Sequence, residues 1–348
     1  MKKRALSPRL SPLKMLPLLL LGVTTLTTPL AQAADFIAKI GHLESTAQSR
    51  HVHLEKVAAL VNERTGGAVE LQIFPQGQLG SQREMTEGVQ LGVLEATVSP
   101  AAFLGGFNPA VSILDIPFLL PADEDQAQAI RAGEFGQALL DSFASRGVVA
   151  IALWPNGRKN FTSNNPLPDI DAFAGQKFRV MDSKILIEQF NALGASAVAL
   201  PFGELYTSLQ TGVVDGQENP LDTIQRMKFY EVQKYLVLSD HGAMEDVVLF
   251  NPLWWNSLPE QHRQVIVTAF AEVVPALRSH KAAAVKSALS VIAEGGMDIR
   301  EITAEERSAL RERMYPPARA AYLERAGSDG ERLIESYEKA YAEVAGQQ

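Results

Sequence analysis

A repeated alternation of strand-like and helix-like segments constrains the fold most. Residues 36–41 have the pattern of a strand, and residues 51–67 that of a helix, with apolar residues on one face and a Gly-Gly stop. Residues 69–75, 81–92 and 95–99 continue as a strand, a capped short helix and another strand. This β-α-β-α-β run is typical of a parallel or mixed sheet that is covered by helices.

A second run of the same kind begins near residue 147. Its expected strands are 147–155, 177–181 and 196–200, its expected helices are 184–194 and 203–212, and the segment 213–220 completes the run. Two α/β modules in one chain predict a cleft between them, which is a preferred place for a small ligand. The C-terminal third is mostly helical, and residues 258–296 predict one long helix, bent near Pro275, that can run along both modules.

The N-terminus has the pattern of a secretory signal peptide. Five basic residues accompany a strongly apolar stretch from Met15 to about Val23, and the segment ends at "AQA", residues 31–33. This stretch is shorter than the roughly 20 apolar residues that cross a bilayer, which disfavours a membrane anchor. We expect cleavage after Ala33 and an exported chain of 315 residues, a length that suits two domains.

The composition restricts the chemistry and the partners of the exported chain. It contains no cysteine, which excludes disulfides, thiol nucleophiles, thiolate metal sites and a lipid-bearing cysteine at the signal junction. Without the five basic residues of the leader, which has no Asp or Glu, 27 basic residues face 40 acidic ones, a net charge of −13. Such a charge argues against nucleic acid or an anionic membrane as partner. The periplasm of a double-membraned bacterium fits these features best.

The familiar catalytic and metal-binding patterns are missing from the sequence. Of the six histidines only His51 and His53 are close in sequence, and residues two apart on a helix point in different directions. No HExxH, GxSxG, GxGxxG or P-loop pattern is present. We therefore expect neither an enzyme nor a bound metal or cofactor.

Three polar residues near strand ends of the second module are candidates for ligand binding. Arg158 follows one predicted strand, Arg179 lies in the next, and Asn219 lies past the end of another. Ligands of open α/β sheets bind outside the carboxyl ends of the strands, and a guanidinium matches the two oxygens of a carboxylate. Two arginines and an amide that converge on one crevice would form a carboxylate receptor.

The pattern alone leaves other interpretations open. The alternation of its strand makes Arg179 compatible with a solvated face, which is the more common outcome for such a charge. Arg158 is equally compatible with a surface loop, and Asn219, which precedes a proline, with a turn. Phe202 and Tyr206 have helical spacing and are more often core residues than a ligand platform.

The segment 175–220 closely resembles the solute-binding subunits of tripartite ATP-independent periplasmic (TRAP) transporters, the DctP family of bacterial dicarboxylate-binding proteins. Several further motifs extend the resemblance, in the same order, over nearly the whole chain after the leader. They are "ERTGGAVELQIFPQGQLGSQREM" (63–85), "DIPFLL" (115–120), "GRKNFTSN" (157–164), "YEVQKYLVLSDHG" (230–242) and "NPLWWNSLP" (251–259).

The resemblance implies a periplasmic binding protein fold of type II, with two α/β domains, a ligand cleft between them and a long domain-spanning helix. Domain I would comprise residues 34–155 and 245–284, and domain II residues 156–244 and 285–348. The domains would close over an organic anion, which the protein would deliver to a small and a large membrane permease subunit. It would do so as a monomer and without a cofactor.

The resemblance also implies a set of site residues. Arg179 would form the principal salt bridge to the ligand carboxylate, Arg158 would support it, and Asn219 would point into the site. Four further contacts are implied less directly: Phe202 packing on the ligand, His241 near the crevice, and Ser99 and His42 from the first domain.

The resemblance does not transfer the identity of the ligand. After "SDHG" many dicarboxylate binders of the family have a run rich in Gly and Tyr, whereas this chain has "AMEDVVLF", with Glu245 and Asp246. These carboxylates would disfavour a second ligand carboxylate if they line the cleft, and would be structural at the domain interface. A four-carbon dicarboxylate, a sugar acid, a hydroxy or keto monoacid and a zwitterion all stay open. An ABC-type binding protein or an exported enzyme are less favoured alternatives.

Overall fold

The computed structural model describes residues 34–346, so the expected signal peptide, residues 1–33, lies outside the described residues. The strands are β1 (Phe36–Gly41), β2 (Val69–Phe74), β3 (Ala96–Pro100), β4 (Val149–Ser163), β5 (Lys177–Val180), β6 (Ser196–Ala199), β7 (Gly216–Pro220), β8 (Tyr235–Phe250) and β9 (Asp298–Glu301). Within the described range they form one mixed sheet of nine strands in the order β2-β1-β3-β8-β4-β7-β5-β6, with β9 paired to β8 outside this path.

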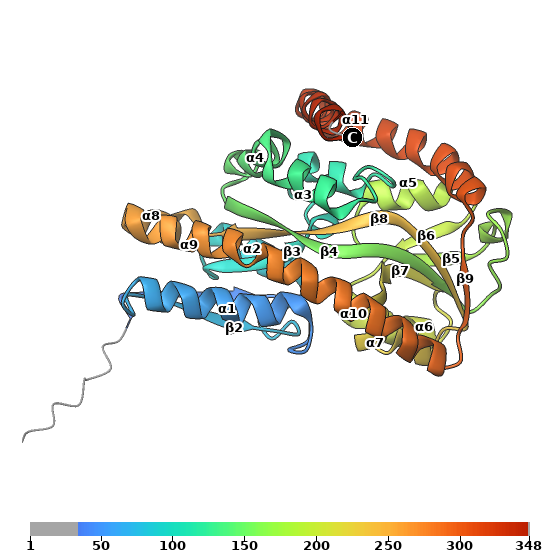
Figure 1. Ribbon diagram of the computed structural model, residues 1–348, viewed down its shortest axis with the longest axis horizontal. Coiled ribbons are helices and arrows are strands. Elements are labelled where there is room, and N and C mark those ends of the chain that lie inside the picture. Colours follow the sequence, from blue (N-terminus) through green and yellow to red (C-terminus); the bar gives the residue numbers. More distant parts are fainter. Residues whose placement is uncertain (1–33, 347–348) are drawn as a thin grey trace, which may run out of the picture. The chain divides into compact units, whose positions relative to one another are not determined.

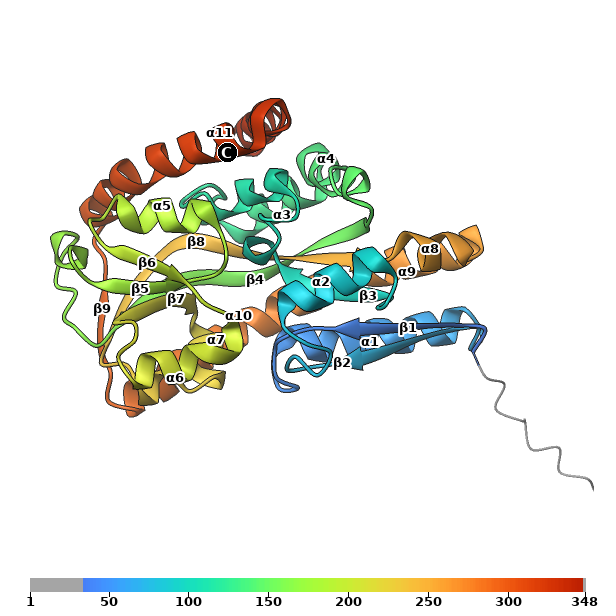
Figure 2. The same cartoon turned by 180° about the vertical axis from the view of Figure 1, so that it is seen from behind.

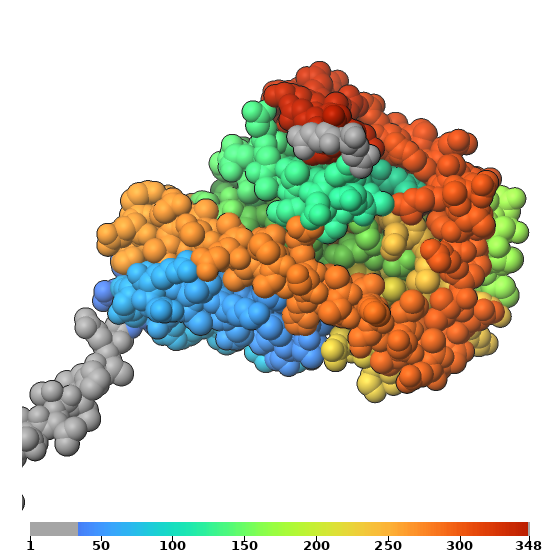
Figure 3. Space-filling view, in the orientation of Figure 1, coloured from blue at the N-terminus to red at the C-terminus, as the bar shows by residue number. Residues whose placement is uncertain are grey.

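Helices cover both faces of this sheet (Figures 1 and 2). They are α1 (Ser49–Arg64), α2 (Gln82–Leu91), α3 (Glu124–Ala132), α4 (Glu134–Asp141), α5 (Lys184–Asn191), α6 (Leu205–Gln210), α7 (Leu221–Arg226), α8 (Pro252–Ser257), α9 (Glu260–Glu272), α10 (Val274–Glu294) and α11 (Ala304–Ala345). Helix α10 contacts both α1 and α7, and Figure 3 shows it, in orange, at the surface. No helix of residues 34–346 has the length and hydropathy needed to cross a membrane.

The two longest strands, β4 and β8, connect the two ends of the sheet. They pair antiparallel with each other, while β8 also pairs with β3 and β4 also pairs with β7. Their mutual register is irregular between Pro155, opposite Glu245, and Arg158, opposite Ala243. The domain boundaries expected from the sequence, 155/156 and 244/245, fall at this irregularity. The division into two domains itself stays a prediction.

Most of the elements expected from strand and helix patterns are present. The expected α2 begins after Ser81, whose side chain and that of Glu84 form the reciprocal hydrogen bonds of a capping box. The long helix expected over 258–296 is divided at Val273 into α9 and α10, with Pro275 in the first turn of α10. The expected strand 147–155 continues to Ser163 as β4, and β8 was not predicted, because both contain long polar stretches.

Aromatic side chains fix the orientation of β5. The Phe178 ring lies 4.7 Å from that of Phe190 and 5.5 Å from that of Phe173, centroid to centroid, in one of the buried clusters of the core. Because successive side chains of a strand point to opposite faces, Arg179 is directed away from this cluster. The core therefore determines which face of the sheet receives the arginine.

Candidate ligand-binding site

The carboxyl ends of six strands converge on one hollow region. Segments that follow β1, β2, β3, β5 and β6, together with the end of β7, line two adjoining hollows, a pocket of about 730 Å³ and an inner cavity of about 20 Å³. The pocket and the cavity share Leu43, Phe103 and Phe202 in their walls. This is the edge of an α/β sheet at which ligands bind.

Arg179 lies directly behind this wall and is 1% exposed. Its Nε and Nη2 donate hydrogen bonds to the carbonyl of Leu200, at 3.0 and 2.8 Å, and Leu200 itself lines the pocket. The guanidinium carbon lies 5.9 Å from the ring centroid of Phe103 and 6.0 Å from that of Phe202. Among the residues that the structure describes, no carboxylate forms an ion pair with Arg179, and its Nη1 makes no hydrogen bond.

The environment of Arg179 is unfavourable for its charge. Burial lowers the pKa of Arg179 to about 10, and the negative charge of Glu218 offsets this only in part. A buried ion without a counter-charge lowers the stability of the folded state. Removing one partner of a buried ion pair, which leaves such an ion, costs about 3 to 5 kcal/mol. An anion that entered the pocket would supply the missing counter-charge.

Two other predicted residues lie at the same place. Asn219 and Phe202 both line the inner cavity, and Asn219 Nδ2 donates to Gln217 Oε1 at 2.5 Å. The structure thus places Asn219 and Phe202 in the wall of one cavity, and the Phe202 ring also flanks the Arg179 guanidinium. Their contacts with a ligand stay predictions.

His241 belongs to a buried polar network. Its Nε2 lies 2.7 Å from Glu218 Oε2, its Nδ1 lies 2.8 Å from Ser239 Oγ, and its ring stacks on Phe161 at 3.7 Å. Glu218 also accepts a hydrogen bond from Lys159 Nζ at 2.7 Å. Burial alone would raise the pKa of Glu218, but the charge of Lys159 and the hydrogen bond from His241 outweigh it and hold the pKa at about 2. Glu218 is therefore ionised in this network.

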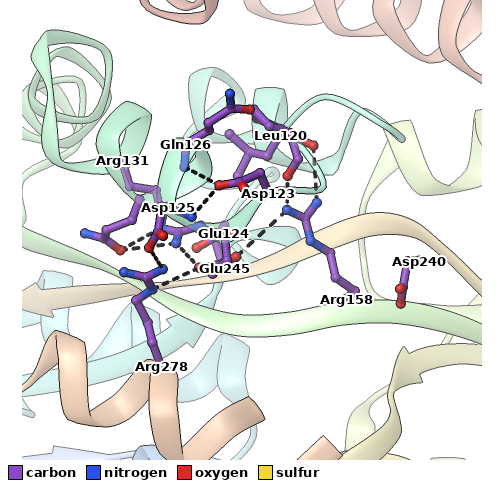
Figure 4. Close-up of polar contacts among 12 residues, drawn as sticks. Leu120, Asp123, Glu124, Asp125, Gln126, Arg131, Arg158, Asp240, Glu245 and Arg278 are labelled. Carbon is purple, nitrogen blue, oxygen red and sulfur yellow. Dashed lines mark hydrogen bonds and ion pairs between the residues drawn. The ribbon is translucent and has the colours of Figure 1, made fainter. Parts of the chain in front are cut away.

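The structure does not bring Arg158 to the same cavity. Arg158 and Lys159 are neighbours in β4 and point to opposite faces. Figure 4 shows the Arg158 guanidinium directed at the loop before α3, where Nη1 donates to the Leu120 carbonyl at 3.2 Å and Nη2 to the Pro121 carbonyl. Arg158 lines a separate pocket of about 190 Å³, and within residues 34–346 it shares no partner with Arg179.

His42 and Ser99 lie next to the cavity wall rather than in it. His42 Nδ1 accepts the Glu44 N–H at 3.2 Å, and burial lowers the pKa of His42 to about 3, which keeps the ring neutral. Ser99 Oγ donates to the carbonyl of Pro100 at 3.1 Å. Their neighbours in the sequence, Leu43 and Glu44 after His42 and Pro100 after Ser99, line the cavity.

Glu44 and Arg50 were not predicted, although both line the inner cavity. Arg50 Nε and Nη2 donate to the carboxylate of Asp246, at 2.6 and 2.5 Å, and Nη2 lies 3.4 Å from Glu44 Oε1. Asp246 is thus a buried partner of a wall residue, while Glu245 pairs with Arg131 at 2.9 Å and lines none of the three cavities described above. The rule that ligands lie at carboxyl strand ends, applied to the first module as well, would have indicated the segment after β1.

The chain is similar to several known proteins. The family described as bacterial extracellular solute-binding protein, family 7 (DctP), matches residues 40–325. The C4-dicarboxylate-binding periplasmic protein DctP of Rhodobacter capsulatus is 32% identical over 315 residues, 89% of this chain and 94% of that protein. A crystal structure of a TRAP periplasmic solute binding protein from Desulfovibrio salexigens with bound orotic acid is 65% identical, with a TM-score of 0.88, covering 89% of this chain and 99% of that one. One from Sulfurospirillum deleyianum with bound succinate is 32% identical, with a TM-score of 0.79, covering 88% and 99%.

The network around Glu218 predicts a specific loss of stability in acid. A carboxyl group whose pKa is depressed on folding stabilises the folded state above its unfolded pKa, 4.5, and loses this contribution as the pH falls toward the folded value, about 2. We expect Glu218→Gln to lower the free energy of unfolding by about 3 kcal/mol at pH 7, and this difference to shrink to about half by pH 3. Urea unfolding of both proteins at pH 7, 4 and 3 measures it.

The exposed Glu63→Gln in α1 is the matched control and should leave the free energy of unfolding unchanged. A difference between wild type and Glu218→Gln that stays constant from pH 7 to pH 3 would contradict the assignment of an ionised, ion-paired Glu218.

Proposed function

Since the chain belongs to the DctP family of bacterial extracellular solute-binding proteins, we propose that it captures an organic carboxylate and delivers it to the membrane subunits of a TRAP transporter. Family membership confirms the resemblance indicated by the sequence motifs, and the fold is that of solved TRAP periplasmic solute-binding proteins. The family consists of binding proteins and not of enzymes. In this proposal residues 1–33 direct export to the periplasm, and a small and a large permease subunit receive the ligand.

One observation carries the carboxylate part of the proposal. Arg179 is a buried cation beside a ligand-sized pocket, and in the described part of the chain no carboxylate neutralises it. A carboxylate matches a guanidinium in geometry and charge, and the Nη1 side of Arg179 is not engaged by Leu200. The relatives with orotic acid and with succinate support this, since both compounds carry a carboxylate.

The arrangement of the pocket walls supports capture by closure. One wall comes from the segment after β2, between residues 76 and 83, and the facing wall from the segment after β6, residues 199–204. A ligand that contacts both walls favours the closed form by its differential affinity for the two forms. Orotate is the first ligand to test, because the relative that binds it is 65% identical; a four-carbon dicarboxylate, a sugar acid, a hydroxy or keto monoacid and a zwitterion are the alternatives.

Replacement of Arg179 tests the carboxylate anchor. We expect Arg179→Met to weaken orotate binding at least 100-fold, because a desolvated ion pair loses one partner, a cost of about 3 to 5 kcal/mol. The melting temperature of the ligand-free protein should not fall, since a buried ion without a counter-ion is replaced by an apolar side chain of similar length. Calorimetric titration and a thermal melt measure the two effects.

Arg158→Met is the matched control, because the Arg158 guanidinium already serves the carbonyls of Leu120 and Pro121. We expect its orotate affinity to stay within about tenfold of wild type. An Arg179→Met variant that binds orotate within tenfold of wild type would contradict the proposed anchor.

Closure predicts a change of size in solution. Saturating orotate should reduce the radius of gyration measured by small-angle X-ray scattering, because the walls on either side of the pocket approach each other. Arg179→Met at the same orotate concentration should keep the ligand-free value. An unchanged radius in the wild-type protein, under conditions in which calorimetry shows saturation, would contradict closure.

A further inference from the structure

We propose that the inner cavity recognises a neutral edge of the ligand that carries an N–H donor beside a carbonyl acceptor, with Glu44 accepting from the N–H and Arg50 donating to the carbonyl. The proposal rests on the function proposed above and narrows its ligand class. The ligand is then a monocarboxylate with an amide, imide or ureide edge, a class that includes pyrimidine carboxylates, and not a dicarboxylate.

Glu44 supplies the acceptor. It is 4% exposed and lines the cavity, yet neither Oε1 nor Oε2 has a hydrogen-bond partner among residues 34–346. The nearest cation, Arg50 Nη2, lies 3.4 Å from Oε1 and is aimed at Asp246. Asn156 lies near Glu44, but its Nδ2 donates to Asp246 Oδ1 at 3.0 Å. Buried polar groups are nearly always hydrogen-bonded, so two buried carboxylate oxygens that lack a hydrogen bond, on a residue that lines a cavity, indicate a donor from outside the chain.

Glu44 carries its charge in this position. Burial would raise the pKa of Glu44, but the charges of Arg50 and Lys281 outweigh it, and the pKa is lowered. An ionised carboxylate offers acceptors only, so the group that it binds must be a donor such as an N–H. Hydrogen bonds to an ionised acceptor are also stronger than those between neutral groups.

Arg50 supplies the donor next to it. Its Nε and Nη2 are engaged by Asp246, whereas Nη1 is buried and, in the described part of the chain, without a hydrogen-bond partner. Thr223 Oγ1, in the same wall, is likewise buried and unpaired among the described residues. The Glu44 carboxylate, an acceptor, thus lies beside a donor, the Arg50 guanidinium. An amide edge, in which an N–H lies beside a C=O, is the complement of this pair.

The charges of the cavity exclude a second ligand carboxylate. Arg50 is already neutralised by Asp246, and two other buried cations of this region, Lys159 and Lys281, by Glu218 and Asp222. A second carboxylate would therefore face the Glu44 carboxylate without a free cation, and like charges at close range are strongly disfavoured. Glu44 thus accepts a hydrogen bond from a ligand N–H and repels a second ligand carboxylate.

The cavity lies within reach of the Arg179 anchor. Phe103 and Phe202 line both the cavity and the larger pocket, and both rings flank the Arg179 guanidinium. The cavity, about 20 Å³, is large enough only for an edge of a ligand, while the pocket of about 730 Å³ holds the remainder. A flat ring that packs on these aromatic side chains can present its carboxylate to Arg179 and a polar edge to Glu44.

Four probes separate the parts of this proposal in calorimetric titrations. Orotate carries the carboxylate and the edge, benzoate a ring carboxylate without the edge, uracil the edge without the carboxylate, and succinate a second carboxylate. The wild-type protein should bind orotate at least tenfold more tightly than each of the others. Glu44→Gln should weaken orotate at least about tenfold, leave benzoate unchanged and strengthen succinate.

Opposite responses to orotate and succinate distinguish recognition from a general loss of structure. Glu63→Gln, an exposed charge of the same helix as Arg50, is the control and should change none of the four affinities. A wild-type protein that does not bind orotate, or that binds benzoate or succinate as tightly, overturns the proposal even if Glu44→Gln does not fold. Equal weakening of orotate and succinate by Glu44→Gln, or no change in orotate, overturns it as well.

The two proposals fail in different ways. Orotate binding that survives Arg179→Met overturns the carboxylate anchor itself. Orotate binding that is lost in Arg179→Met but unchanged in Glu44→Gln overturns only the assignment of the inner cavity.

Discussion

A buried charge needs a counter-charge, and this requirement organises the interior at the carboxyl edge of the sheet. The buried cations there pair with buried carboxylates: Lys159 with Glu218, Arg50 with Asp246, Arg131 with Glu245 and Lys281 with Asp222. Arg179 is equally buried, and among the described residues it has only a backbone carbonyl and two aromatic rings as partners. A ligand carboxylate can therefore supply the negative charge that Arg179 lacks.

The same requirement explains the long polar segments of β4 and β8. These two strands run through both halves of the sheet, and their residues on either side of the register break supply the ion pairs that hold the site. Arg158 and Lys159 are adjacent in β4, and their side chains point to opposite faces of the sheet. Lys159 belongs to the network beside the cavity, and Arg158 ties β4 to the loop before α3.

Local pattern predicted much of the fold and less of the site. The alternating segments 36–99 and 177–220 could be predicted because apolar periodicity and Gly stops are local signals, and helix α2 had a capping box. Strand β8 and the second half of β4 could not be predicted. Their polar residues can be buried because partners far away in the sequence pair with them, as Glu218 does with Lys159. The family resemblance, and not the alternation of its strand, pointed to Arg179 as a ligand residue. Glu44 follows β1, where the rule for carboxyl strand ends also applies, whereas only the tertiary structure places Arg50, in helix α1, at the cavity.

The account depends on a ligand carboxylate at Arg179, and a crystal structure of the wild-type protein with orotate tests this most directly. We expect both carboxylate oxygens within hydrogen-bond distance, about 2.7 to 3.0 Å, of the Arg179 guanidinium nitrogens, and the ring between Phe103 and Phe202. A bound orotate whose carboxylate contacts other residues, while Arg179 keeps only the Leu200 carbonyl, would contradict the account.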